Sequence, residues 1–291
     1  MTIFKSVEEK AKLIAWFERF RERLNVPTRS QFVETSFGTT HIMVGGPEHA
    51  ENLVILHGQL ATSAHALVEL APLLERFRVY AVDIVGQSVM GHDELLSVSN
   101  NDYGHWLKEV LDGLGLTRVH VLGVSFGGFV AMRLAAVAPE RIERLVLLVP
   151  AGVVKSHWSG WYKIGIPMTL YLMSPTQKRL EAFLANLLTT PEDQEWVGYM
   201  GDVFRSVNLA RMKIPRLAKL GEFAAMEAPI LVLGADQDLS FPGEQLIARL
   251  GELFTSVQDT ELIKDCRHCP PTNDDFRGWL GARISNFLLA N

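Results

Sequence analysis

The chain has 291 residues, and 48% of them are hydrophobic, which supports a sizeable core and excludes a disordered protein. Lys and Arg total 28 against 33 Asp and Glu, and the net charge of −5 argues against a nucleic-acid-binding surface as the main function. With only two cysteines, a disulfide-rich secreted scaffold is also excluded.

The N-terminal segment carries charges every few residues and lacks the apolar run of about 7–15 residues that marks a signal peptide. Ile14, Trp16, Phe17 and Phe20 predict an amphipathic helix packed on the protein body, with contact to a membrane surface as the alternative. The uncharged stretch 164–177 has 14 residues and two prolines, too short and interrupted to span a bilayer. We therefore expect a cytoplasmic location and no stable membrane insertion.

Strand-like and helix-like segments alternate along most of the chain. The predicted strands are 31–36 and 39–44, joined as a hairpin, then 53–56, 79–82, 119–122, 144–149, 230–233 and 256–263. The predicted helices are 64–76, 103–114, 126–137, 245–250 and 274–289. Short apolar strands flanked by helices favour parallel pairing with both faces covered. The sequence thus predicts an α/β fold with one doubly wound, mostly parallel sheet.

The alternation stops between residues 153 and 222, where the pattern is helical and rich in Trp, Tyr and Met. We expect an α/β core made of residues 1–152 and 223–291 and an inserted helical cap made of residues 153–222. Such an insertion after one strand suits a lid over the carboxyl ends of the strands. Within it, we expect His157, Trp158 and Trp161 to contact the substrate.

A candidate nucleophile stands in Gly123-Val124-Ser125-Phe126-Gly127, between a predicted strand and a predicted helix. In that setting G-x-S-x-G is typical of a nucleophile elbow, whose sharp turn projects the serine hydroxyl above the sheet. A tight turn with an N-capping serine is the alternative. A dinucleotide-binding motif is excluded because Ser125 occupies a position that requires glycine.

A serine nucleophile needs a base and a group that orients the base. His268 follows the last predicted strand and precedes the last helix, so its loop can bring the imidazole to Ser125. Asp238 and Asp236 both follow the strand 230–233. We prefer Asp238 as the orienting acid because it lies deeper in the loop, and Asp236 as an organiser of the turn.

An oxyanion hole is expected from the backbone N–H groups of Gln59 and Phe126. Gly58, which follows the strand 53–56, lets the backbone turn so that an amide points at the serine. His57 is then an organiser of this loop rather than a base.

Cys266 and Cys269 bracket His268 in a single C-x-x-C. A metal or redox centre is possible in principle, but there is no second ligand pair, and metal binding would consume His268. We interpret the cysteines as free thiols and expect no metal and no cofactor.

Together these motifs resemble the α/β-hydrolase superfamily over nearly the whole chain, in the order Ser125, Asp238, His268. One departure is the segment 83–88, which reads DIVGQS where many members carry Gly-x-Gly-x-Ser. The resemblance implies a serine hydrolase with a helical cap. Dehalogenases and epoxide hydrolases of the superfamily use an aspartate nucleophile, and Ser125 argues against both.

The expected function is hydrolysis of a carboxylic ester with a small apolar substrate, through an acyl-enzyme intermediate. The first alternative is a C–C bond hydrolase of a ring-cleavage product, which uses the same triad. The second is a non-catalytic binding protein on the same scaffold. A small molecule is the expected partner, no nucleic acid is expected, and no oligomeric state is predicted.

Overall fold

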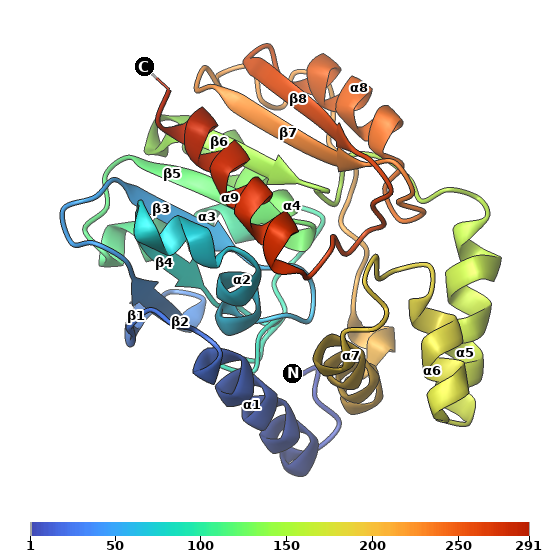
Figure 1. Ribbon diagram of the computed structural model, residues 1–291. Helices are drawn as coiled ribbons and strands as arrows, with labels where there is room; N and C mark the ends of the chain where they lie inside the picture. The colour runs from blue at the N-terminus through green and yellow to red at the C-terminus, as the bar shows by residue number, and fades with distance from the viewer. Residues whose placement is uncertain (1, 291) are drawn as a thin grey trace.

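One eight-stranded sheet runs through the computed structural model, which describes residues 2–290 (Figure 1). Its strands are β1 (Thr28–Thr35), β2 (Gly38–Gly45), β3 (Asn52–Leu56), β4 (Arg78–Val82), β5 (Val119–Val124), β6 (Ile142–Leu148), β7 (Ile230–Ala235) and β8 (Val257–Ile263). Their order in the sheet is β1-β2-β4-β3-β5-β6-β7-β8. β1 and β2 are antiparallel to their neighbours, and β4, β3 and β5 to β8 are parallel, so the predicted fold class is confirmed.

Helices cover both faces of the sheet. They are α1 (Val7–Glu22), α2 (Ser63–Glu69), α3 (Asp102–Gly113), α4 (Phe126–Val137), α5 (Ile166–Met173), α6 (Gln177–Leu184), α7 (Gln194–Ser206), α8 (Gly243–Leu253) and α9 (Asp274–Leu288). Helices α1, α2 and α9 pack on one face, and α3, α4 and α8 pack on the other. Along β3, Val54 and Leu56 enter one core while Leu53 and Ile55 enter the other, as the two-residue period of a strand requires.

The helix predicted over residues 64–76 is divided in two. α2 ends at Glu69, and a 3₁₀ helix continues over Ala71–Glu75 with Pro72 in its first turn. Proline has no N–H to bond to the carbonyl four residues earlier, and its ring clashes with that carbonyl. The prediction of one continuous helix is therefore wrong at Pro72.

The N-terminal helix α1 is packed on the body, as predicted, and its buried side chains are Leu13, Phe17 and Phe20. Trp16 donates a 2.8 Å hydrogen bond from Nε1 to Asp202 of α7. The apolar face of α1 is thus used in packing, and the membrane-surface alternative for this helix is not supported. Within residues 2–290, no helix has the length and apolar character needed to cross a membrane.

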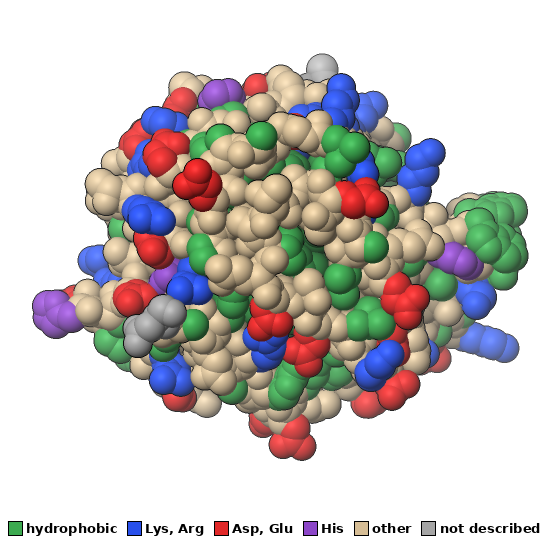
Figure 2. Space-filling view, turned by 90° about the horizontal axis from the view of Figure 1, so that it is seen from above, with side chains coloured by type: hydrophobic (Ala, Val, Ile, Leu, Met, Phe, Trp, Pro, Cys, Tyr) green, Lys and Arg blue, Asp and Glu red, His purple; other side chains and the backbone are tan. Residues whose placement is uncertain are grey.

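The chain between β6 and β7, residues 149–229, adds no strand to the sheet and contains α5, α6 and α7. We call it the β6–β7 insertion; a π-helical turn (Trp161–Gly165) precedes α5. In Figure 1, α5 and α6 stand away from the sheet, whereas α7 lies beside α1. The space-filling view shows hydrophobic side chains gathered on a projection at the same edge as α5 (Figure 2).

Candidate active site

Ser125 stands in a strained turn between β5 and α4. Its φ of 51° and ψ of −111° are unusual for a residue with a side chain. Strand and helix approach so closely that a Cβ added to Gly123 would lie 2.5 Å from the Gly127 carbonyl oxygen. A Cβ added to Gly127 would lie 2.2 Å from the carbonyl oxygen of Leu56 in β3. The glycines therefore permit the sharp turn that projects the serine hydroxyl.

Two loops at the same edge of the sheet bring His268 and Asp238 to this serine. The distance from Ser125 Oγ to His268 Nε2 is 3.0 Å, and that from His268 Nδ1 to Asp238 Oδ2 is 2.7 Å. The other carboxylate oxygen of Asp238 accepts hydrogen bonds from the backbone N–H of Ser240 at 2.6 Å and of Phe241 at 3.0 Å. Since the carboxylate accepts from Nδ1–H, Nε2 is left free to accept the serine proton.

Asp236, the alternative acid, does not reach His268. Its side chain accepts a 3.1 Å hydrogen bond from the backbone N–H of Cys266, and the residue is exposed, whereas Asp238 is buried. The structure therefore places Asp236 as a link between two loops rather than as the organiser of its own turn that we expected.

Burial and the charge of Asp238 have opposite effects on the pKa of His268. Burial disfavours the imidazolium, but the negative charge of Asp238 and its hydrogen bond outweigh this effect, so the pKa of His268 is raised. An imidazole held in this way is a stronger proton acceptor than an isolated one.

The loop after β3, which carries Gly58 and Gln59, lies beside Ser125. A Cβ added to Gly58 would lie 3.6 Å from Ser125 Cβ, so the loop runs directly beside the serine. Gln59 and Phe126 both line the cavity at Ser125, and no hydrogen bond within residues 2–290 engages the backbone N–H of either residue. Two uncommitted donors beside the Ser125 hydroxyl are an arrangement that could stabilise an oxyanion formed there.

His57 holds this loop in place. Its Nδ1 donates to the Gly58 carbonyl oxygen at 2.7 Å, and its Nε2 accepts from the backbone N–H of Ile84 at 2.9 Å. Burial lowers the pKa of His57, although the charge of Asp83 opposes the effect, so the ring is neutral. His57 is a loop organiser in the structure, as its sequence position suggested.

A cavity of about 460 Å³ opens at Ser125 and His268. The β6–β7 insertion supplies much of its wall through Leu188, Trp196, Tyr199, Met200, Met212 and Ile214. None of the three insertion residues expected to contact substrate is in this wall: Trp158 and Trp161 are 72% and 70% exposed, and His157 bonds to Ser159. That expectation is corrected, because the segment carrying these residues packs outward while α7 packs inward.

The model of the α/β hydrolase fold family matches residues 51–274, well over half of the chain. The chain belongs to the α/β-hydrolase family. It is 28% identical over 266 residues to the uncharacterized carboxylesterase nap of Bacillus subtilis (strain 168), with 88% of this chain and 86% of that protein covered. It is 26% identical over 273 residues to carboxylesterase YbfK of the same organism, covering 91% and 90%.

Solved structures agree with this assignment. The crystal structure of naproxen esterase (carboxylesterase NP) from Bacillus subtilis has a TM-score of 0.80 to this chain at 25% identity, covering 97% of this chain and 99% of that one. The predicted family and fold are confirmed, and the chain is a carboxylesterase-like serine hydrolase. The C–C hydrolase alternative is not favoured by these relatives.

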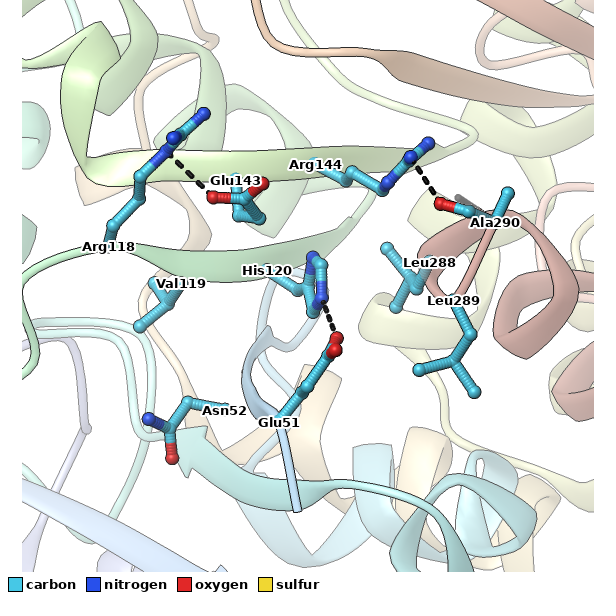
Figure 3. A pocket seen from close by; sticks show the side chains of 10 residues that line it. All are labelled: Glu51, Asn52, Arg118, Val119, His120, Glu143, Arg144, Leu288, Leu289 and Ala290. Carbon is cyan, nitrogen blue, oxygen red and sulfur yellow. Dashed lines mark hydrogen bonds and ion pairs between the residues drawn. The ribbon is translucent and has the colours of Figure 1, made fainter. Parts of the chain in front are cut away.

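A second cavity, of about 400 Å³, lies at the opposite end of the sheet (Figure 3). It is lined by Asn52 and Val119, which begin β3 and β5, and it contains a hydrogen bond of 2.7 Å between His120 Nε2 and Glu51 Oε2. No Ser, Thr or Cys is among its described lining residues. Because α/β enzymes place their chemistry at the carboxyl ends of the strands, the cavity at Ser125 is the candidate site of this hydrolase.

The β6–β7 insertion makes hydrogen bonds to the loop that carries His268 and to the loop after β3. Thr189 Oγ1 donates to the Cys269 carbonyl oxygen at 2.7 Å and accepts from the Arg267 backbone N–H at 2.9 Å, so it bridges the residues on either side of His268. The Tyr199 hydroxyl donates to the carbonyl oxygen of Leu60, in the loop after β3. The sequence pattern did not identify these two contacts, because both depend on how the insertion packs.

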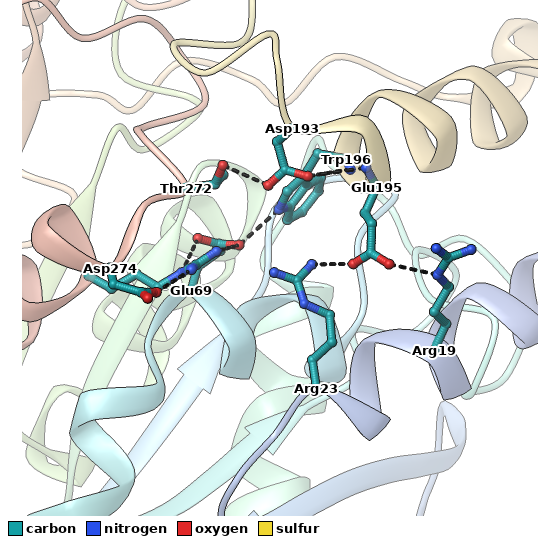
Figure 4. A network of polar contacts seen from close by, with 9 residues as sticks. Arg19, Arg23, Glu69, Asp193, Glu195, Trp196, Thr272 and Asp274 are labelled. Carbon is teal, nitrogen blue, oxygen red and sulfur yellow. Dashed lines mark hydrogen bonds and ion pairs between the residues drawn. The ribbon is translucent and has the colours of Figure 1, made fainter.

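A network of polar contacts also joins the segment after His268 to α7, and α7 to the end of α1 (Figure 4). Thr272, four residues after His268, donates to Asp193 at 2.8 Å, and Asp193 caps α7. Glu195 in the first turn of α7 accepts from Arg19 of α1 and from Arg23, which caps the C-terminus of α1, each at 2.7 Å. The loop that carries His268, α7 and α1 are thereby linked by a series of polar contacts.

Cys266 and Cys269 are unpaired thiols. Burial, together with the negative charge of Asp238, raises the pKa of each to about 12, so both are protonated at neutral pH. A protonated thiol is a poor nucleophile. Among residues 2–290, no three His, Cys, Asp or Glu side chains are grouped to hold a metal ion.

Proposed function

We propose that this protein hydrolyses carboxylic esters through an acyl-enzyme on Ser125. The observation that carries the proposal is the continuous hydrogen-bonded series Asp238–His268–Ser125 at an apolar cavity. His268 Nε2 accepts the proton of Ser125 Oγ as that oxygen attacks the ester carbonyl carbon, and Asp238 stabilises the imidazolium that forms.

The negative charge of the tetrahedral intermediate develops on the former carbonyl oxygen. The backbone N–H groups of Gln59 and Phe126 are the proposed donors to that oxygen, a contribution typically worth about 3 kcal/mol per donor. His268 then gives its proton to the departing alcohol and afterwards activates a water molecule, which hydrolyses the acyl-enzyme. Every catalytic group in these steps comes from the chain itself and the only co-reactant is water, so the proposed reaction requires no cofactor.

The proposed substrate is a small ester with an apolar acyl or alcohol part. The wall formed by Trp196, Met200 and Ile214 supports this, since apolar side chains stabilise apolar groups that leave water. Similarity to an esterase named for naproxen supports an acyl group of comparable bulk. We further propose that residues 153–222 act as the cap over this cavity, and that the enzyme is cytoplasmic.

Covalent labelling together with a substrate panel tests the function. A fluorophosphonate is expected to form one adduct per chain, on Ser125, and p-nitrophenyl esters are expected to turn over faster than a vinylogous diketone ring-cleavage product. Faster cleavage of the diketone would replace the esterase by the C–C hydrolase. No adduct and no turnover of either class would favour the non-catalytic binding protein.

The pH dependence of the reaction follows from the raised pKa of His268. Only the neutral imidazole accepts a proton, so kcat/KM for an uncharged ester is expected to rise with pH and to level off above a pKa higher than the ordinary histidine value of about 6.5. The measurement is kcat/KM as a function of pH over the acidic range in which it rises, called here the acidic limb. A midpoint of this rise below the ordinary histidine pKa would contradict the proposed effect of Asp238 on His268.

Thr189→Val is expected to reduce kcat by up to about 10²-fold, the effect of moving a catalytic group by about 1 Å. Valine removes the hydroxyl that bridges Arg267 and Cys269 and leaves the Arg267 N–H without its partner. Thr189→Ser keeps the hydroxyl and is expected to restore the rate. Thr189 is outside the cavity wall, so KM is expected to change little. Equal kcat in the two variants would show that Thr189 does not position the base.

A further inference from the structure

A row of large apolar side chains is exposed on the outer side of the β6–β7 insertion. We call it the aromatic ridge, and it consists of Trp158, Trp161, Tyr162, Ile166, Leu170 and Met173. Met173 is 78% exposed, and Trp158 and Trp161 are nearly as exposed. Figure 2 shows hydrophobic side chains gathered on a projection at the edge of the molecule where α5 lies.

The ridge is continuous rather than a scatter of single residues. Tyr162, Ile166, Leu170 and Met173 recur every three or four positions through the π-helical turn and α5, which places these four on one side of the helix, and Trp158 and Trp161 precede them in the same segment. The rings of Trp158 and Tyr162 are in contact, with 5.8 Å between their centroids. Isolated exposed apolar residues need no explanation, but a contiguous apolar patch marks an interaction surface.

Positive charge predominates in the segment that carries the ridge. Residues 153–181 contain Lys155, Lys163, Lys178 and Arg179 and one acid, Glu181 of α6, although the whole chain has a net charge of −5. None of these four cations takes part in an ion pair within residues 2–290. The ridge therefore lies in a segment with an excess of positive charge, whose complement is an anionic surface.

We propose that the aromatic ridge docks this protein reversibly on lipid surfaces that carry anionic headgroups. Trp and Tyr prefer the boundary between headgroups and hydrocarbon, where Ile166, Leu170 and Met173 would also leave water. Lys side chains flanking such residues reach the anionic headgroups and add electrostatic attraction. The helices carrying the ridge are too short to span a bilayer, so the binding is peripheral.

The same charges argue against a second copy of this chain as the partner. A two-fold dimer would place the ridge against itself and bring four unpaired cations of one protomer against four of the other. Like charges at a contact oppose association unless an anion lies between them. A lipid surface supplies both the apolar layer and the negative charge.

The ridge is anchored close to the mouth of the active-site cavity. The backbone N–H of His157 donates to the carbonyl oxygen of Leu239 at 2.9 Å, and Leu239 follows Asp238. Ser156, two residues before Trp158, lines the cavity. Docking by the ridge would thus bring the cavity mouth near the lipid surface, but the lipid binding itself does not depend on the proposed esterase function.

Co-sedimentation of the full chain with vesicles tests the proposal without measuring catalysis. Binding is expected to vesicles of phosphatidylcholine with phosphatidylserine, to be much weaker with phosphatidylcholine alone, and to decline as salt is raised. Trp158→Ser combined with Trp161→Ser is expected to abolish it. Each of Lys155→Gln and Lys163→Gln is expected to weaken it about fivefold.

The matched control is Phe32→Ser, which removes an aromatic side chain that is 60% exposed on β1, outside the ridge, and is expected to bind like the parent protein. All variants should retain turnover of a water-soluble ester, which verifies folding. Absence of binding to anionic vesicles, or equal loss in the Phe32 and ridge variants, would overturn the proposal. A dimer in sedimentation velocity that the ridge substitutions dissociate would replace lipid docking by self-association.

Discussion

Ser125→Ala is expected to lower kcat for ester hydrolysis by roughly 10⁵-fold or more, as loss of a nucleophile does in other serine hydrolases. The hydroxyl makes its hydrogen bond to His268 and none other within residues 2–290, so its removal leaves the surrounding packing unchanged. The melting temperature is therefore expected to stay close to that of the parent. The measurements are single-turnover kinetics and thermal unfolding of the purified variant.

Ser240→Ala is the matched control for this experiment. Ser240 also lines the cavity, but it contacts Asp238 through its backbone N–H, and no side-chain hydrogen bond of its own is found in the described chain. Its kcat is expected to remain close to that of the parent. Near-normal kcat in Ser125→Ala, or equal losses in both variants, would contradict the role proposed for Ser125.

The sheet was predictable because local pattern and topology agree. β5, the Ser125 turn and α4 follow the apolar runs and glycines closely, since burial on both faces requires continuous apolar strands. Each of Ser125, Asp238 and His268 follows a strand in sequence. Parallel strands end at the same edge of a sheet, so the fold class alone brings these loops together.

The sequence did not predict which residues of the β6–β7 insertion face the cavity and which face solvent. Trp158, Trp161, Trp196 and Tyr199 are all large and aromatic, and composition does not distinguish those that face the cavity from those that face solvent. The packing of α7 against α1 decides which of these side chains face the cavity. It depends on contacts between residues remote in sequence, such as Trp16 and Asp202. The Asp193 N-cap and the apolar spacing in α7 were the available signals, and they locate a helix without orienting it.

Asp238→Asn is expected to lower kcat by roughly 10⁴-fold, and the structure gives a specific reason. One carboxylate oxygen of Asp238 accepts from two backbone N–H groups, those of Ser240 and Phe241. In the asparagine variant only the amide oxygen can accept from these donors, so the amide NH₂ must face His268 Nδ1. Nδ1 then becomes the acceptor, and the proton moves to Nε2, which can no longer take a proton from Ser125.

Asp236→Asn separates this effect from a general disturbance of the loop. Within residues 2–290, the Asp236 side chain accepts only from the Cys266 backbone N–H, and an asparagine oxygen can accept the same bond, so kcat is expected to fall less than about tenfold. The acidic limb of kcat/KM adds a second readout: it should stay in place for Asp236→Asn. In Asp238→Asn it should move to lower pH, because the charge that raises the pKa of His268 is gone. A large loss for Asp236→Asn with little change for Asp238→Asn would assign the orienting acid to Asp236, whereas equal losses would point to loop stability as the common cause.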